Sequence, residues 1–262
     1  MTSAIVVPCY DEAARFDAGN FEQLAQVVDR LVLVDDGSSD RTPALLDQVA
    51  ERAPGGAVTV IHLARNRGKA EAVRAGMQAA VTGGASIVGY VDADFATPVP
   101  EVERLLAVIT KDPRLEAVLA SRVALLGHSI RRKATRHYLG RLYATAASLA
   151  LDVAVYDTQC GAKLFRVSDT LGAALVDPFP DRWSFDVELL ARLLHPARGL
   201  LPIGAGQIVE VPLREWHDVG GSKLHTLPAA RSLLALAGVR RRIAARRTVT
   251  RAVAGGAAEA DR

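Results

Sequence analysis

Two carboxylates one residue apart are the residues of this sequence best suited to chemistry. Asp92 and Asp94 come directly after an apolar run over residues 87–91, which predicts a buried strand. At the mouth of a strand, both side chains can point toward one hard divalent cation, Mg²⁺ or Mn²⁺, which prefers oxygen ligands. The alternative is structural, because Asp residues in a strand-to-helix turn often only cap backbone N–H groups. Thr97 as N-cap and Pro98 as the first helical residue predict that a helix follows at once.

The elements that would position these carboxylates alternate along the chain. Apolar runs predict strands, and helical periodicity with capping residues predicts helices between them. This alternation is typical of an α/β fold with a mostly parallel, doubly wound sheet, in which ligands bind beyond the carboxyl ends of the strands. The expected strands are residues 4–10, 31–34, 58–63, 85–91 and 115–120, and the expected helices are residues 21–30, 42–52, 98–110, 131–151 and one that begins at 66–69.

Other polar residues also fall at the predicted carboxyl ends, which makes one shared site the expectation. Carboxylates can accept hydrogen bonds from a base and a ribose and can hold a divalent cation on a diphosphate. No G-x-G-x-x-G follows the first strand and no G-x-x-x-x-G-K-[ST] occurs, which argues against a dinucleotide-binding Rossmann domain and a P-loop. The residues at these ends are Tyr10, Asp11, Glu12, Asp35, Asp36 and Lys69.

Composition limits the possible classes of protein. With 262 residues, half of them hydrophobic, the chain fits one large α/β domain or a domain with an appendage. Two cysteines are too few for a disulfide framework or a Cys-rich zinc site, so we expect a reducing cytoplasmic compartment. The first residues lack the pattern of a signal peptide, and no apolar run approaches the roughly 20 residues that span a bilayer. We therefore expect any contact with a membrane to be peripheral.

The motifs together resemble inverting glycosyltransferases of family 2, which have the GT-A fold. In the first half the resemblance rests on V-P-C-Y-D-E (7–12), V-D-D-G-S-S-D (34–40), N-R-G-K-A-E-A-V-R-A-G-M (66–77) and D-A-D (92–94). The second half is similar to dolichyl-phosphate β-glucosyltransferases and their bacterial relatives. It contributes D-T-Q-C-G-A-K-L-F-R (157–166), R-W-S-F-D-V-E-L-L (182–190) and E-V-P-L-R-E-W-H-D-V-G-G-S-K-L (210–224), so that the resemblance spans about residues 3–245.

The resemblance implies a metal-dependent transfer of a hexose, foremost glucose from UDP-glucose, onto a polyprenyl or dolichyl phosphate at the cytoplasmic face of a membrane. Two enzymatic alternatives remain open: a GDP-mannose-dependent polyprenyl-phosphate mannosyltransferase, and a family 2 transferase with a soluble sugar acceptor. A non-catalytic nucleotide-sugar-binding module that has kept the fold is a third, against which the joint presence of Lys69, the D-A-D motif and the D-T-Q-C-G segment argues.

The resemblance also implies roles for individual residues. It places Asp36 on the base or ribose, Lys69 near the base or diphosphate, Asp92 on the ribose or sugar side, and Asp94 on the metal ion. The nucleoside pocket would be lined by Pro8, Tyr10 and Glu12.

Two positions depart from the family pattern. Ala96 stands where some mannose synthases have a further polar metal ligand, so the metal shell here would draw on water, the diphosphate or a later residue. Ala162 stands where Phe is usual, for which we expect only a local change in packing.

A basic segment follows the fifth predicted strand. Its helix also carries an apolar stripe, and a basic start beside such a stripe suits an anionic lipid headgroup, although a solvated basic helix face is the alternative. Aromatic residues make up only 5% of the chain and do not interleave this segment as a stacking platform would require, which argues against nucleic acid. We therefore predict a polyprenyl phosphate acceptor, with its phosphate on Arg122 and on Arg132 or Arg136. The basic residues are Arg122, Arg131, Arg132, Lys133, Arg136 and Arg141.

Three further residues are candidates in the second half. We predict that Asp186, at the start of a helix, orients the sugar or the acceptor, because a phosphate has its second pKa at about 6 and needs no base to become a nucleophile at neutral pH. Lys223 ends a Gly-rich loop and is predicted to close on the diphosphate. His217 could complete the metal shell, but a structural, hydrogen-bonded histidine is the commoner alternative.

The end of the chain mixes leucines with arginines. Leu233, Leu234, Leu236, Val239 and Ile243 alternate with six arginines between residues 231 and 247. This pattern predicts an amphipathic helix that lies on acidic lipid, with an ordinary basic surface helix as the alternative. We therefore divide the chain into a GT-A catalytic domain over residues 1–226 and a basic amphipathic helix with a disordered tail over residues 227–262. The expected location is cytoplasmic, peripheral to the inner face of the membrane.

Overall fold

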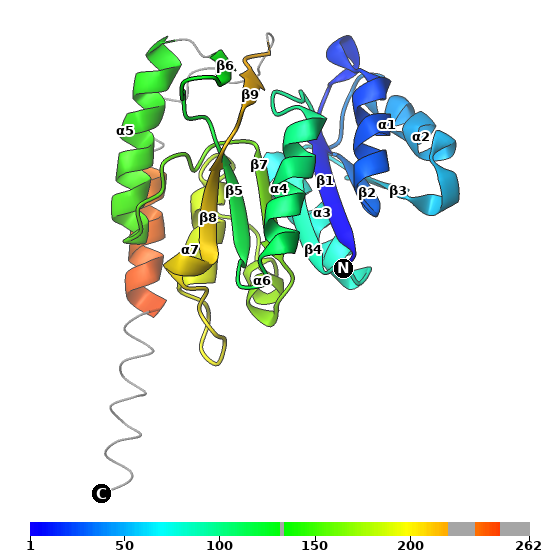
Figure 1. Cartoon of the computed structure of the whole chain (residues 1–262). Helices are drawn as coiled ribbons and strands as arrows, with labels where there is room; N and C mark the ends of the chain where they lie inside the picture. Colours follow the sequence, from blue (N-terminus) through cyan, green and yellow to red (C-terminus); the bar gives the residue numbers. More distant parts are fainter. Residues whose placement is uncertain (132–133, 220–233, 247–262) are drawn as a thin grey trace, which may run out of the picture.

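The fold is built on a central seven-stranded sheet with helices on both faces (Figure 1). The structure, a computed structural model, describes residues 1–131, 134–219 and 234–246, without the side chains of residues 131–139. The strand order is β3-β2-β1-β4-β7-β5-β8, and a separate parallel pair joins β6 to β9. The strands are β1 Ser3–Cys9, β2 Arg30–Asp35, β3 Val58–His62, β4 Ile87–Val91, β5 Ala117–Ser121, β6 Ser129–Arg131, β7 Ala162–Arg166, β8 Ile208–Pro212 and β9 Glu215–His217.

The predicted parallel strands are present, and the sheet is mostly parallel as expected. Strands β1, β2, β3 and β4 form one parallel block, and β5 pairs in parallel with β8. The prediction missed β6, β7, β8 and β9. Among them, β7 inserts between β4 and β5 and runs antiparallel to both. Its Lys163 is fully buried, and the two basic residues in this five-residue strand, Lys163 and Arg166, hide the buried-strand pattern.

The described residues before β8 contain seven α-helices and three short 3-10 turns, and residues 234–246 form a further helix. Helix α4 begins at Val99, and Pro98, not Thr97, is its N-cap, so the predicted Thr97 cap is wrong. The helices are α1 Ala18–Val27, α2 Thr42–Arg52, α3 Lys69–Thr82, α4 Val99–Lys111, α5 Ala134–Leu151, α6 Asp169–Ala174 and α7 Phe185–Leu194, and the 3-10 turns are η1 Ala13–Arg15, η2 Pro54–Gly56 and η3 Ala205–Gln207.

Alternating side chains of each strand form two hydrophobic cores, one on each face of the sheet. In β1, Val6 faces the layer of α3, α5, α6 and α7, whereas Ile5 and Val7 face α1, α2 and α4. Helix α3 lies very close to the sheet, because a Cβ atom added at Gly76 would lie 2.4 Å from the Val6 side chain. The first turn of α3 therefore sits directly beside the carboxyl ends of β1 and β4.

The amphipathic helix near the end of the chain packs on protein. Residues 234–246 are helical, and the side chains of Leu236, Val239 and Ile243 are buried in the same core as α7 (orange helix, Figure 1). We predicted that these three residues face lipid, and that prediction is wrong, because the hydrophobic effect is satisfied equally by a protein surface. Leu234 is exposed, and Leu233 lies outside the described residues. The domain division at residue 226 stays a prediction.

Candidate active site

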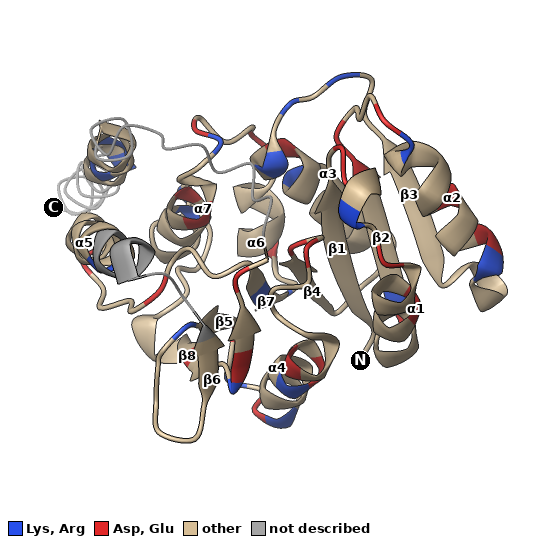
Figure 2. Cartoon of the chain, turned by 90° about the horizontal axis from the view of Figure 1, so that it is seen from above, with Lys and Arg blue, Asp and Glu red and all other residues tan. Residues whose placement is uncertain are grey.

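A cavity of about 270 Å³ opens at the carboxyl ends of β1, β2 and β4. Acidic residues mark the loops beyond these strands when the molecule is seen from above (Figure 2). Seven predicted donor-site residues line this donor cavity, so the structure brings together side chains from four segments of the first half. They are Pro8, Tyr10, Glu12, Asp36, Lys69, Asp92 and Asp94. Their individual roles stay predictions.

Asp92 is held in place from two sides. Its backbone N–H donates to the Gly161 carbonyl at 3.0 Å, and its Oδ1 lies 2.5 Å from Lys69 Nζ. A Cβ atom added at Gly161 would lie only 2.1 Å from the Asp92 carboxylate. Burial by itself would lower the Lys69 pKa, but the Asp92 and Asp186 carboxylates outweigh it and raise that pKa. Lys69 therefore stays protonated, and Gly161 leaves the space that the Asp92 side chain needs.

Asp94 combines a structural bond with a free carboxylate oxygen. Its Oδ1 accepts the Ala96 N–H at 3.1 Å, so the predicted capping alternative is present, but Oδ2 accepts no hydrogen bond from the described residues. Burial, and then the neighbouring Asp92 charge, raise the Asp94 pKa. A divalent cation beside Oδ2 would relieve this repulsion, so the residues present fit a metal ion. The described residues offer no cluster of three metal-binding side chains, and Ala96 supplies none.

Asp36 fixes a wall of the cavity. Its two oxygens accept the N–H groups of Arg67 at 2.8 Å and Gly68 at 2.7 Å. Burial raises the Asp36 pKa in spite of these bonds. Gly68 has φ +94°, a conformation that favours glycine, so the turn before α3 depends on both residues.

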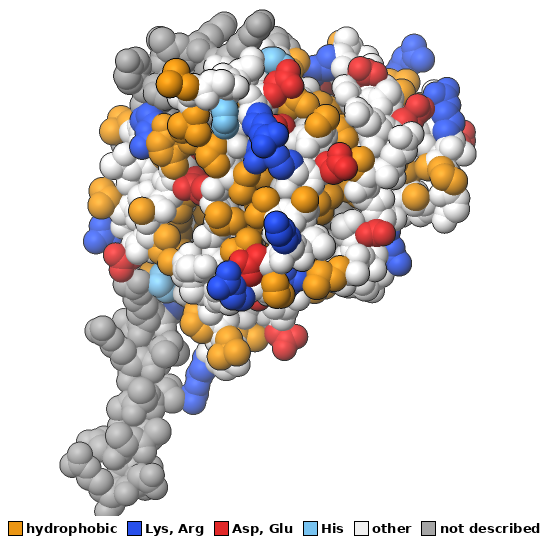
Figure 3. Space-filling model, in the orientation of Figure 1, with side chains coloured by type: hydrophobic (Ala, Val, Ile, Leu, Met, Phe, Trp, Pro, Cys, Tyr) orange, Lys and Arg blue, Asp and Glu red, His pale blue; other side chains and the backbone are white. Residues whose placement is uncertain are grey.

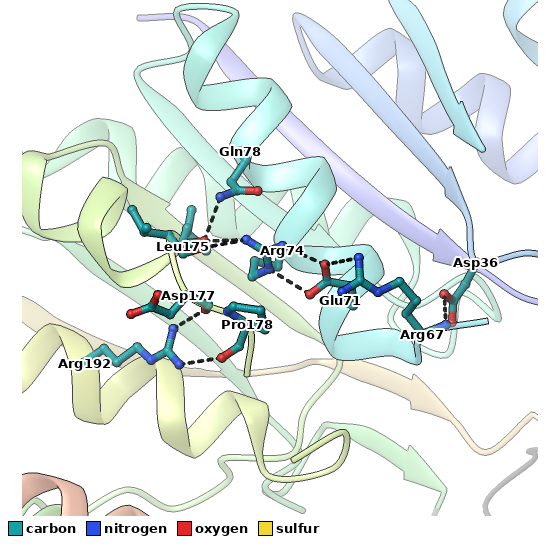
Figure 4. A network of polar contacts seen from close by, with 10 residues as sticks. Asp36, Arg67, Glu71, Arg74, Gln78, Leu175, Asp177, Pro178 and Arg192 are labelled. Atoms are coloured by element: carbon teal, nitrogen blue, oxygen red, sulfur yellow. Dashed lines mark hydrogen bonds and ion pairs between the residues drawn. The ribbon is translucent and has the colours of Figure 1, made fainter. Parts of the chain in front are cut away.

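The loop between α6 and α7 brings a distant aromatic residue to the cavity. Trp183 lines the cavity, and two arginines hold the start of its loop through backbone carbonyls (Figure 4). Arg74 donates to Leu175 O at 2.9 Å, and Arg192 donates to Asp177 O at 2.6 Å. Our sequence reasoning included Trp183 in a motif but assigned it no role, and it also missed the lining residues Arg15 and Asn66.

Asp186 lies behind the cavity and not in its lining. Only 4% of the residue is exposed, and its Oδ1 accepts hydrogen bonds from Tyr90 Oη and, at 2.7 Å, from Lys163 Nζ. Lys163 Nζ also donates to Cys160 O at 2.6 Å. Ser184, not Asp186, is the N-cap of α7. The predicted role of Asp186 toward sugar or acceptor stays a prediction.

Arg122 also lies at this edge of the sheet but outside the cavity lining. Its Nε and Nη2 donate to Asp157 at 2.7 and 2.8 Å, and its guanidinium lies 5.3 Å from the centre of the Trp216 ring. Burial opposes the charge of Asp157, but Arg122 outweighs it and lowers the Asp157 pKa to about 2. Glu210 accepts the Asp157 N–H at 2.8 Å and so fixes the same segment.

The remaining predicted residues divide into two groups. His217 lies in β9, where its N–H donates to Ala96 O at 3.1 Å, next to the Asp94 turn, while its side chain contacts Glu215 at 2.7 Å. Arg132 and Lys223 lie outside the described residues, and Arg136 lies on α5 outside the described side chains.

Comparison with known proteins identifies the family. The family model for glycosyl transferase family 2 matches residues 4–171. This chain belongs to that family. The mouse dolichyl-phosphate beta-glucosyltransferase is 31% identical over 240 residues, which cover 84% of this chain and 69% of the mouse protein. An undecaprenyl-phosphate 4-deoxy-4-formamido-L-arabinose transferase from Sodalis glossinidius is 38% identical over 115 residues, 42% of this chain and 34% of that protein.

Solved structures confirm the GT-A fold of this family 2 protein. The UDP complex of glucosyl-3-phosphoglycerate synthase from Mycobacterium tuberculosis matches with a TM-score of 0.62 at 17% identity, over 91% of this chain and 80% of that one. The mannosyltransferase PcManGT from Pyrobaculum calidifontis, in complex with GDP-Man and Mn²⁺, has a TM-score of 0.52 at 19% identity, over 99% and 80% of the two chains. At these identities the likeness concerns the fold alone.

Proposed function

We propose that this protein is an inverting, metal-dependent glucosyltransferase that moves glucose from UDP-glucose onto a polyprenyl phosphate. The observation that carries the proposal is the D-x-D pair at the donor cavity, where the Asp94 carboxylate retains a free oxygen and Lys69 neutralises Asp92. The names of the dolichyl-phosphate and undecaprenyl-phosphate relatives support the reaction class and the acceptor class. The family 2 membership supports transfer itself.

In the proposed mechanism the chain binds and orients the two substrates for in-line displacement at the anomeric carbon. Pro8, Tyr10, Glu12 and Asp36 hold the nucleoside, and Lys69 neutralises the Asp92 carboxylate near the diphosphate. Asp94 would hold Mg²⁺ or Mn²⁺, with water, the diphosphate or His217 completing the shell. Such an ion neutralises charge on the leaving diphosphate.

The hydrogen bonds of the cavity favour an acceptor that is already ionised. Glu12 pairs with Arg15, Asp36 accepts two backbone N–H groups, and Asp92 pairs with Lys69. Among the described carboxylates that line the cavity, none is therefore free to act as a general base apart from the proposed metal ligand Asp94. A sugar hydroxyl needs such a base, whereas a phosphate oxygen is already a nucleophile at neutral pH. A polyprenyl phosphate therefore suits this cavity better as the acceptor than a soluble sugar does.

The acceptor phosphate would lie toward the basic side of the sheet edge. We place it on Arg122, which follows β5, with Arg132 or Arg136, and we place Asp186 and Lys223 on the sugar and the diphosphate. Asp157 fixes the Arg122 guanidinium through two hydrogen bonds. A long side-chain cation held in one orientation loses little entropy when it binds an anion.

An exposed apolar loop supports peripheral contact with a membrane, which we place at the cytoplasmic inner face. Leu126 is fully exposed and Leu125 is half exposed in the β5–β6 connection, at the same sheet edge as the cavity. Hydrophobic side chains gather at the top of the face drawn in Figure 3. Leu142 and Leu149 of α5 are exposed as well. In the part of the chain that the structure describes, no helix has the length and apolar composition needed to cross a bilayer.

The experiment that tests the reaction supplies purified protein with a short polyprenyl phosphate, Mg²⁺ or Mn²⁺, and labelled UDP-glucose or GDP-mannose in parallel. We expect label from UDP-glucose to enter the organic phase, and EDTA to prevent it. Transfer from GDP-mannose alone would overturn the donor assignment. Transfer only to a soluble sugar would overturn the acceptor assignment.

The membrane proposal has its own test. We expect Leu126→Ser to weaken co-sedimentation with anionic vesicles, because a serine contributes no apolar area to the bilayer. Leu201→Ser is the matched control, since Leu201 is also largely exposed but lies in the loop before η3, away from the cavity. Equal binding by both variants and the unmodified protein would contradict a role for this loop.

A further inference from the structure

Arg15 is a cavity residue with a hydrogen-bond donor to spare. It ends η1, the turn after β1, and lines the donor cavity together with Asp92 and Asp94. Its Nε and Nη2 both donate to the Glu12 carboxylate, the second at 2.8 Å. Its Nη1 is buried and has no hydrogen-bond partner among the described residues. Buried polar atoms are nearly always paired, so an unpaired guanidinium nitrogen beside a ligand cavity calls for a partner that the ligand supplies.

The backbone holds this turn in a fixed position before any ligand arrives. The Glu12 N–H donates to Thr42 Oγ1 at 2.7 Å, and the Arg15 N–H donates to Glu12 O at 3.0 Å. The Ala13 N–H donates to Asp40 Oδ2 at 3.0 Å. Because Glu12 and Arg15 form a two-bond fork on this fixed turn, the guanidinium plane has little freedom.

Arg15 lies close enough to the D-x-D carboxylates to interact with them electrostatically. Hydrogen bonding to Glu12 is the main cause that raises the Arg15 pKa, and the Asp94 and Asp92 charges raise it further, so the guanidinium lies within the field of the proposed metal ligand. The other cation of the cavity lining, Lys69, is already paired with Asp92 at 2.5 Å. That pair uses one of the three N–H donors of Lys69. Arg15 is therefore a second lining cation with an N–H donor for an incoming anion, and its donor is fixed in direction by the two bonds to Glu12.

We propose that Arg15 binds the diphosphate of the sugar donor, with Nη1 donating to a phosphate oxygen, and that it keeps this contact as the diphosphate leaves. The inference rests on the proposed function, in which the donor is a nucleoside diphosphate sugar. The two hydrogen bonds between Arg15 and Glu12 would then serve both residues. They position Glu12 in the nucleoside pocket, and they orient the Arg15 guanidinium toward the phosphates.

The competing explanation is that Arg15 only supports Glu12. Comparing the binding of uridine with that of UDP distinguishes the two explanations, because only UDP carries the diphosphate. We would measure the affinity of both ligands by calorimetry for the unmodified protein, Arg15→Gln and Arg15→Lys. We expect Arg15→Gln to weaken UDP binding about tenfold, the effect of one charge-assisted hydrogen bond, and to leave uridine binding within about twofold. Arg15→Lys keeps the positive charge but loses the paired hydrogen bonds to Glu12. Its affinity for UDP should therefore lie between those of the unmodified protein and Arg15→Gln.

Two controls make the result decisive. Arg114→Gln removes an exposed arginine that also pairs with a nearby carboxylate, Asp112, and it should change neither affinity. The measurement is repeated in EDTA. The ratio of the affinity for UDP to the affinity for uridine should still be lower in Arg15→Gln than in the unmodified protein, because the proposed contact does not involve the metal ion. An equal loss of uridine and UDP affinity would overturn the inference and leave Arg15 as a support for Glu12. Failure of the unmodified protein to bind UDP would instead overturn the proposed function.

Discussion

The donor cavity and the region behind it use the same kinds of charged residue in opposite ways. In the cavity, Asp94 keeps a free oxygen and a raised pKa, and Arg15 keeps an unpaired N–H. In the paired region, which we define as Arg122, Asp157, Lys163 and Asp186, each charge meets an opposite charge within the protein. A charge that folding leaves unsatisfied points to a ligand, whereas a charge that folding satisfies stabilises the fold, whether or not it also contacts a substrate. Changes in the cavity should therefore alter ligand binding with little effect on stability, and changes in the paired region should lower stability in addition to any effect on the proposed contacts of Arg122 and Asp186.

The largest expected effect is the loss of transfer in Asp94→Asn. Asparagine can still accept the Ala96 N–H, so the fold should survive, but it removes the anionic ligand for the metal ion. We expect the transfer rate to fall by about a thousandfold, measured with labelled donor, with an unchanged melting temperature. The control Asp169→Asn changes an exposed acid at the start of α6 and should keep full activity. Substantial activity in Asp94→Asn would break the comparison at its central residue.

The next effect concerns stability and lies in the paired region. Lys163→Met leaves Asp186 buried without its cation, which should destabilise the protein by about 3–5 kcal/mol in urea unfolding. Adding Asp186→Asn should recover part of that loss, because a neutral amide can still accept the Tyr90 hydroxyl. If Lys163→Met had the same unfolding free energy as the unmodified protein, Lys163 would not stabilise the buried Asp186 carboxylate.

A smaller effect on binding is expected at Gly161, where the two regions meet. An alanine Cβ would push the Asp92 carboxylate away, and an overpacking cost of about 1–3 kcal/mol corresponds to a loss of about ten- to a hundredfold in affinity for UDP with Mn²⁺. Gly172→Ala is the matched control, since an added Cβ there meets no atom within 4 Å. Equal affinity in the two variants would contradict the role of Gly161 in positioning Asp92.

The smallest effect is a dependence of stability on pH. Because Arg122 lowers the folded-state pKa of Asp157 to about 2, below the ordinary aspartate pKa of about 4, its contribution is nearly complete above about pH 4 and is lost as the pH falls toward 2. The full contribution is roughly 2 kcal/mol, of which about half is lost between pH 7 and pH 3. Urea unfolding at pH 7 and pH 3 should show a smaller pH effect in Asp157→Asn than in the unmodified protein. If the two proteins lost the same unfolding free energy between pH 7 and pH 3, groups other than Asp157 would cause the sensitivity to acid.

Local patterns determined the donor half of this protein. The apolar runs, the turn residues after them and the helix starts gave β1 to β4 and the clustering of Tyr10, Asp36, Lys69 and Asp92 at one edge, because parallel strands bring their carboxyl ends together whatever their order. The fold and the cavity lining could be predicted for this reason. Arg15 escaped notice because its partner Glu12 lies three residues away, a spacing that looks the same in any exposed helical turn.

Only the tertiary structure decided the rest. Strand β7 runs antiparallel between β4 and β5, and its Lys163 is buried because Asp186, 23 residues later in the chain, pairs with it. Trp183 lines the cavity, and the start of its loop is held by Arg74 of α3 and Arg192 of α7, which donate hydrogen bonds to backbone carbonyls there. The apolar face of residues 234–246 packs in the same hydrophobic core as α7 and so does not face lipid. Sequence periodicity reports that a side chain avoids water, but which surface covers it depends on contacts between distant segments.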